Sequence, residues 1–89
     1  MKAIVTVNGK DQVGIIATVC TLLSLHSVNV LDISQTILQG YFTMTMLVDA
    51  EKTDIPFADL VVALEEAGVK LGLAIHAQRE ELFNAMHRI

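Results

Sequence analysis

Near its start, this chain reads Gly9-Lys10-Asp11-Gln12-Val13-Gly14-Ile15-Ile16. The residues before this stretch, 3–7, alternate in the manner of a β-strand, and those after about Val13 have helical apolar spacing. A turn with glycines at both ends, between a strand and a helix, gathers backbone N–H groups where the helix leaves them without partners. That geometry suits a carboxylate or a phosphate, so the stretch favours a ligand-sensing module over an enzyme.

The rest of the chain continues this alternation of strands and helices. We predict strands at about 2–8, 29–38, 41–50 and 69–78, helices at about 13–26 and 54–68, and an amphipathic tail helix within 80–89. Gln39-Gly40 forms the tight turn between the second and third strands. We expect Asp11 to cap the first helix and Asp54 the second, with Pro56 in its first turn and Gly68 at its end.

This order predicts an α+β fold, a ferredoxin-like βαββαβ sandwich. A four-stranded antiparallel sheet carries both long helices on one face, and residues 1–89 form a single domain. The alternation separates an apolar face from a polar one. The apolar set, expected to face the helices, is Val5, Val7, Ile33, Ile37, Phe42, Met44, Met46, Leu71, Leu73 and Ile75. The polar set, expected on the open face, is Thr6, Asp32, Ser34, Thr36, Thr43, Thr45, His76 and Gln78.

Charge and composition exclude several functional classes. The net charge is −4 and the six basic residues are scattered, whereas nucleic-acid binding needs a basic patch, so we expect no nucleic-acid partner. No apolar run approaches the length that spans a bilayer, so we expect no membrane segment. Met1-Lys2-Ala3 passes straight into the strand pattern and Cys20 has no second cysteine to pair with, so we expect a cytoplasmic protein without a signal peptide.

Catalytic and metal-binding patterns are missing from the sequence. His26, His76 and His87 lie far apart, and Cys20 falls on the apolar stripe of the first predicted helix. No histidine-directed nucleophile or closely spaced carboxylate pair stands out. We therefore predict no enzyme activity, no metal site and no cofactor.

Three motifs resemble the ACT domain, a small-molecule-binding module of amino-acid metabolism. They are Gly9-Lys10-Asp11-x-x-Gly14-Ile15, Asn29-Val30-x-Asp32 and Tyr41-Phe42-Thr43-Met44. More narrowly, the chain is similar to the stand-alone single-domain proteins of the UPF0237 group, and it departs from many ACT domains at Gln12-Val13, where Arg-Pro is frequent.

The resemblance implies a ligand site and a partner. In the family an amino acid commonly lies between the first loop and the second strand, often at the interface of a homodimer. The implied ligand-binding residues are Asn8, Gly9, Lys10, Asp11, Gln12, Val13, Gly14, Ile15, Asn29, Val30 and Leu31. Glycine and serine are the amino acids that we consider first.

Each of these residues also has a purely structural interpretation. Asp11 serves either as the helix cap or as a ligand contact, and the two roles are compatible. Gly14 provides either close helix–strand packing or room for a ligand. Asn29 either favours the turn into its strand or contacts the ligand, and Asp32 fits a solvated carboxylate.

Two functions follow from the sequence. The first is a regulatory module that binds a small amino acid and acts through a homodimer, in which edge strands two and four offer unpaired backbone for side-by-side pairing. The alternative is a protein-interaction subunit without a small ligand. It would dock through the open sheet face or through the tail-helix stripe Leu82, Phe83, Met86 and Ile89.

Overall fold

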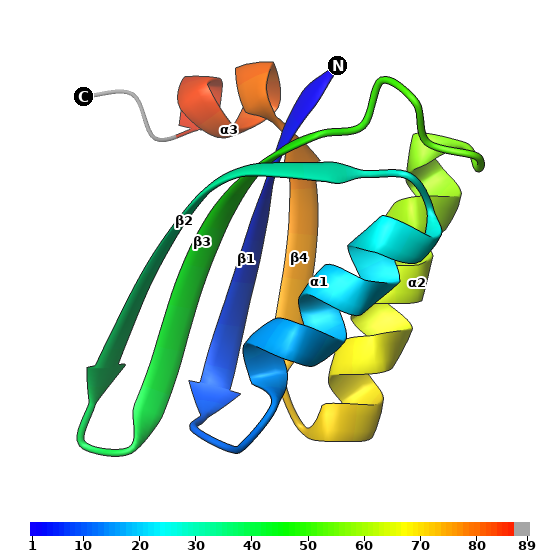
Figure 1. Ribbon diagram of the computed structural model, residues 1–89. Helices are drawn as coiled ribbons and strands as arrows, with labels where there is room; N and C mark the ends of the chain where they lie inside the picture. Colours follow the sequence, from blue (N-terminus) through cyan, green and yellow to red (C-terminus); the bar gives the residue numbers. More distant parts are fainter. Residues whose placement is uncertain (87–89) are drawn as a thin grey trace.

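Figure 1 shows the computed structural model of the chain, which describes residues 1–86. The predicted βαββαβ fold is confirmed, with a short third helix after the last strand. The elements are β1 Lys2–Lys10, α1 Ile15–Leu25, β2 Asn29–Leu38, β3 Tyr41–Asp49, α2 Phe57–Leu71, β4 Ala74–Arg79 and α3 Glu80–Met86.

The four strands form one antiparallel sheet in the order β2-β3-β1-β4. The two long helices lie side by side over one face, on the β1–β4 side of the sheet, while β2 extends beyond them as a free edge (Figure 1). β2 and β4 are therefore the edge strands, as the sequence predicts.

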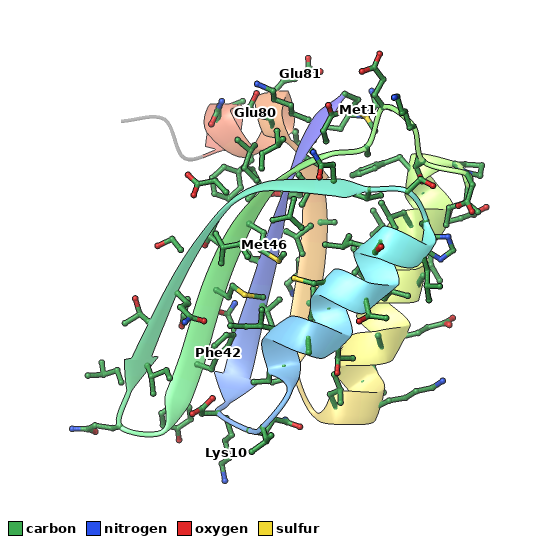
Figure 2. The ribbon with its side chains drawn as sticks, viewed as in Figure 1. Met1, Lys10, Phe42, Met46, Glu80 and Glu81 are labelled. Atoms are coloured by element: carbon green, nitrogen blue, oxygen red, sulfur yellow. The ribbon has the colours of Figure 1, made fainter. Side chains whose placement is uncertain are left out.

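The core lies between the helices and the sheet. α1 contributes the buried side chains Ile15, Val19 and Leu23, whose spacing places them on one side of the helix. α2 contributes Leu60 and Leu64 in the same way. On the sheet, the predicted apolar residues Val5, Val7, Phe42, Met44, Met46, Leu73 and Ile75 are all buried. Phe42 and Met46 are labelled where they point from β3 toward the helices in Figure 2.

Ile33 and Ile37 lie on the predicted face of the sheet, but the helices do not bury them. Ile33 pairs with Met46 and Ile37 pairs with Phe42, so both lie on the helix-facing side of the sheet. They are nevertheless 40% and 56% exposed, because β2 lies outside the area that the helices cover. Alternation in the sequence fixes the face of a strand residue but says nothing about whether a helix reaches it.

The predicted side-chain caps are also wrong. α1 begins after Gly14, without a hydrogen bond from any side chain to its first turn, so Asp11 does not cap it. α2 begins after Pro56, which precedes the helix rather than lying in its first turn, and Asp54 does not cap it. Asp54 instead pairs with His26 at the end of α1, with 2.9 Å between Oδ1 and Nδ1.

Gly68 does not end α2 as predicted. The helix continues to Leu71 and ends at Gly72, whose φ of 72° is the left-handed conformation that glycine favours. Leu71 consequently belongs to the helix instead of the sheet, and the last strand starts at Ala74. Gly68 has a packing role, because a Cβ there would lie 2.7 Å from the Leu73 carbonyl oxygen.

The tail helix is confirmed over Glu80–Met86, and its predicted continuation to Arg88 and Ile89 lies outside the described residues. Phe83 is half-buried at the sheet, whereas Leu82 is 53% exposed. No helix in the described part of the chain is long and apolar enough to cross a membrane.

Candidate ligand-binding site

The start of α1 is open to a ligand. Gly14 adopts φ 86°, and apart from Gly14 and its two chain neighbours no heavy atom of the described residues lies within 4 Å of the place where its Cβ would stand. The first N–H to donate into the helix is that of Thr18, which bonds the Gly14 carbonyl oxygen at 2.9 Å. The N–H groups of residues 15–17 precede that bond, so they need acceptors from outside the helix. The positive end of the helix dipole adds to their preference for an anion.

A cavity of about 210 Å³ lies beside this helix start. Its walls come from the β1–α1 loop, the first turn of α1 and the end of the sheet. The lining residues are Asp11, Gln12, Gly14, Ile15, Ile16, Ala17, Gln35, Ile37 and Phe42. Asp11 supplies a carboxylate, Gln35 supplies an amide, and the apolar wall is formed by side chains of α1, β2 and β3. The cavity thus combines groups for an anion with an acceptor for a cation.

Two hydrogen bonds hold the loop at this cavity in place. The Asp11 backbone N–H donates to the Gly40 carbonyl oxygen in the β2–β3 turn at 2.8 Å. The Gln12 side-chain amide donates to the Leu71 carbonyl oxygen at the end of α2, also at 2.8 Å. The loop is therefore tied both to the hairpin and to the second helix, and its shape is set before any ligand arrives.

The structure gathers only part of the predicted site around the cavity. Asp11, Gln12, Gly14 and Ile15 line it. Gly9 and Lys10 lie in β1, and Lys10 projects from the lower end of the sheet in Figure 2.

The other five predicted residues lie elsewhere. Asn8 lines a different hollow, on the open face of the sheet. Val13 is fully exposed at 103%. Asn29, Val30 and Leu31 start β2 at the opposite end of the sheet, since Asn29 pairs with Asp49 while Leu38 pairs with Tyr41. At about 3.3 Å per residue, Asn29 is roughly 30 Å along β2 from the end next to the loop. Within one chain, the two halves of the predicted site do not meet.

Five lining residues were not predicted: Ile16, Ala17, Gln35, Ile37 and Phe42. The positions of Gln35, Ile37 and Phe42 could have been predicted from the sequence. The turn at Gln39-Gly40 places the end of one strand and the start of the next at the same end of the sheet as the β1–α1 loop. Ile16 and Ala17 come directly after Ile15 and lie in the first turn of the helix.

The start of β2 lines a second hollow, of about 390 Å³, together with polar residues of the neighbouring turns. Ser27, Asn29, Asp49, Glu51 and Lys52 form its walls. The pKa of the Asp49 carboxyl is lowered, chiefly because the Glu51 backbone N–H donates to it at 3.0 Å. The N-terminal ammonium, 3.6 Å away, acts in the same direction. In residues 1–86, no group of three or more His, Cys, Asp or Glu side chains is arranged to hold a metal ion.

Comparisons with known proteins agree with this architecture. The ACT domain family model matches residues 2–78. A UPF0237 protein of Bifidobacterium longum is 59% identical over 88 residues, which cover 99% of this chain and 98% of that protein. A UPF0237 protein of Clostridium acetobutylicum is 52% identical over the full length of both chains.

Solved structures show the same fold. An ACT domain protein from Streptococcus pneumoniae superposes with a TM-score of 0.82 at 40% identity, covering 98% of each chain. A formyltetrahydrofolate deformylase from Pseudomonas putida matches 88% of this chain with 28% of its own length, at a TM-score of 0.77 and 18% identity, which shows a shared fold alone. From its sequence and its structure, this chain belongs to the ACT domain family and, within it, to the UPF0237 proteins.

Proposed function

We propose that this protein is a regulatory module that binds a small amino acid and acts through a homodimer. The observation that carries the proposal is the open space at Gly14, next to the unpaired amides of α1 and the Asp11 carboxylate. The amides at residues 15–17 accommodate the carboxylate of the amino acid, assisted by the helix dipole. Asp11 accepts hydrogen bonds from its ammonium group.

The size of the cavity favours a small side chain. Its volume of about 210 Å³ is below the usual range of pockets for drug-sized ligands, about 300–1,000 Å³. Ile37 and Phe42 supply apolar wall, so a large polar side chain has few partners there. Glycine and serine are therefore the first ligands to test.

The β2 edge supports the homodimer. The whole ten-residue strand is exposed or half-exposed, and its outer backbone groups face no other strand within residues 1–86. Large apolar side chains, among them Ile33 and Leu38, are exposed on it at 40% and 70%. A long, apolar, unpaired edge readily adds another strand, and pairing with a second copy of itself closes a symmetric dimer.

Such pairing also reunites the two halves of the predicted site. If two β2 strands lie antiparallel about a two-fold axis near Ile33 and Ser34, residues 29–31 of each copy come next to residues 36–38 of the other. Ile37 lines the cavity. Asn29, Val30 and Leu31 of the second copy then border the cavity of the first, and a bound amino acid contacts both chains.

The alternative function, docking on a protein partner through α3, has one supporting observation, the 53% exposure of Leu82. Deleting residues 80–89 distinguishes the two. The amino-acid module keeps its ligand after the deletion, because all of the residues around the Gly14 cavity lie before residue 43. A chain that functions by docking loses its partner instead.

Thermal unfolding with and without each common amino acid tests the proposal, and calorimetry then gives the affinity. We expect glycine or serine to raise the melting temperature, since a ligand at 100 times its Kd stabilises the folded state by about 2.7 kcal/mol. Asp11→Asn removes the charge that pairs with the ammonium group and weakens binding about tenfold or more. The matched control is Asp59→Asn, an exposed carboxylate in the first turn of α2.

The control variant keeps the affinity of the original protein. The proposal fails if no common amino acid stabilises the protein at millimolar concentration. It also fails if Asp11→Asn binds as tightly as the original chain.

A further inference from the structure

A further hollow lies on the other face of the sheet, away from the helices α1 and α2. Its volume is about 430 Å³, within the range of small-molecule sites. Three neighbouring strands form its floor and α3 forms one wall. The lining residues are Ile4, Thr6, Asn8, Thr43, Thr45, His76, Gln78 and Phe83.

The floor is a regular grid of polar side chains. Thr6 of β1 pairs with Thr45 of β3 on one side and with His76 of β4 on the other, so these three stand in a row across the sheet. Asn8 and Thr43 form the next row. Neighbours within a row are about 4.8 Å apart and the rows are about 7 Å apart along the strands. Side chains of neighbouring strands and rows are therefore close enough to contact one small polar ligand at the same time.

Most of this grid is available to a ligand. Within residues 1–86, the side chains of Thr6, Asn8, Thr43, Thr45 and His76 have no hydrogen-bond partner in the protein. Their hydroxyl, amide and imidazole groups both donate and accept hydrogen bonds, so they bind water in the free protein and can exchange it for a ligand's polar groups.

The charge of the lining restricts the ligand. None of the lining residues is Asp, Glu, Lys or Arg, so an ionised ligand would lose hydration there without gaining an opposite charge. Phe83 and Ile4 add apolar surface at one side of the grid. We propose that this cavity binds an uncharged small molecule with several hydroxyl or amide groups around an apolar ring face, the chemistry shared by free sugars and free nucleosides.

This second site is independent of the amino-acid site. No residue lines both cavities, and the two lie on opposite faces of the sheet, since Phe42 and Thr43 are neighbours on β3 that point to opposite sides. α3 is needed only for the open-face site, because Phe83 belongs to that helix. The tail helix, which the ACT family model does not cover, thereby acquires a function in shaping a pocket.

Nuclear magnetic resonance titration of the ¹⁵N-labelled full chain tests the proposal. The probes are glucose and adenosine, each compared with its charged counterpart, glucose 6-phosphate and adenosine monophosphate. We expect at least one uncharged probe to shift the signals of Thr6, Thr45 and His76 at millimolar concentration, while those of Gly14 and Ile15 stay in place. The charged counterpart binds about tenfold more weakly or not at all. Shifts with glucose identify the ligand class as a sugar, and shifts with adenosine identify it as a nucleoside.

Two variants sharpen the test. Thr45→Val keeps the shape of the side chain and its preference for a strand but removes the hydroxyl, so the affinity falls about five- to tenfold. Phe83→Ala removes the aromatic wall, and Leu82→Ala is its matched control on the exposed side of α3. We expect Phe83→Ala to weaken binding and Leu82→Ala to leave it unchanged, with both variants folded, because neither residue belongs to the buried core.

The proposal is overturned if neither uncharged probe shifts these signals, or if the charged counterparts bind equally well. It is also overturned if Thr45→Val binds as tightly as the original chain. Shifts at Gly14 and Ile15 alone would assign the probe to the amino-acid site and contradict this proposal without affecting the first.

Discussion

At the scale of single residues, Gly68 shows how packing overrides helix propensity. It lies inside α2, where replacement of a glycine by alanine ordinarily stabilises a helix by about 1 kcal/mol. A Cβ at this position would stand 2.7 Å from the Leu73 carbonyl oxygen and 3.0 Å from Ile75 Cγ1. Leu73 lies directly before β4, so the missing Cβ at Gly68 allows α2 to approach the start of that strand closely.

We therefore predict that Gly68→Ala destabilises the protein. Overpacking costs about 1–3 kcal/mol, and the rigid backbone oxygen at Leu73 places this position toward the upper part of that range, so a net loss of up to about 2 kcal/mol remains after the gain in helix propensity. Chemical denaturation measures the free energy of unfolding. The matched control is Glu66→Ala, an exposed position in the same helix, which should change that free energy by no more than about 0.5 kcal/mol. A stabilised Gly68→Ala variant would contradict this packing account.

The ends of the helices explain why residue-level prediction was incomplete. The sequence correctly identifies Asp11, Gly14 and Ile15 as neighbours of a helix start, because their spacing after a strand leaves few other arrangements. It does not show whether the helix starts with a side-chain cap at Asp11 or with Gly14 in a left-handed conformation, because either one can lead the chain from the strand into the helix. Likewise Gly68 and Gly72 both fit a helix end, and only the close approach of Leu73 separates their roles.

At the scale of elements, β2 is an edge strand whose outer side pairs with no other strand within residues 1–86. Its register against β3 shifts between Val30 and Asp32, which leaves Leu31 unpaired with β3. Beyond this point the strand continues to Leu38 with one edge free (Figure 1). The strand pattern in the sequence predicts the element and its face, but coverage by a helix or by a second copy depends on parts of the assembly that no local pattern encodes.

Ile33→Lys should separate the protein into monomers if β2 forms the dimer interface. A lysine on an edge strand is a common barrier to edge pairing, because joining two copies would bury two like charges. Its long aliphatic stem still covers the sheet, so the monomer remains folded. Analytical ultracentrifugation measures the mass, and circular dichroism confirms the fold.

Val62→Lys is the matched control for this experiment, since Val62 is an exposed β-branched residue on α2, at 51% against 40% for Ile33. We expect it to leave the mass unchanged. Equal masses for Ile33→Lys and the original protein would exclude β2 as the interface.

At the scale of the whole molecule, the proposed amino-acid site, divided between two copies, would make ligand binding and association of the copies interdependent. A ligand that contacts the Gly14 cavity of one copy and residues 29–31 of another binds the dimer more tightly than the monomer. By linkage, the same factor then strengthens the dimer. The β1–α1 loop, tied to Gly40 and Leu71, carries the effect to the hairpin and to α2 in each copy.

We predict that glycine or serine, whichever binds, lowers the dissociation constant of the dimer by about 5–150-fold. Sedimentation of the original chain over a range of concentrations, with and without the amino acid, measures this constant. Asp11→Asn keeps the β2 edge intact, so at an amino-acid concentration near the Kd of the original chain its dissociation constant should stay close to the unliganded value. If the amino acid binds but leaves the dissociation constant of the dimer unchanged, the site is complete within one chain.

The two edge strands of the sheet, β2 and β4, differ in length. β4 pairs over only six residues, Ala74–Arg79, before the chain turns directly into α3 at Glu80, whereas β2 runs for ten. Head-to-tail stacking of β2 on the β4 edge of another molecule would propagate without limit into filaments. Because β4 is short and is followed directly by α3, it offers little backbone for such stacking, and this favours the symmetric pairing through β2 that we propose.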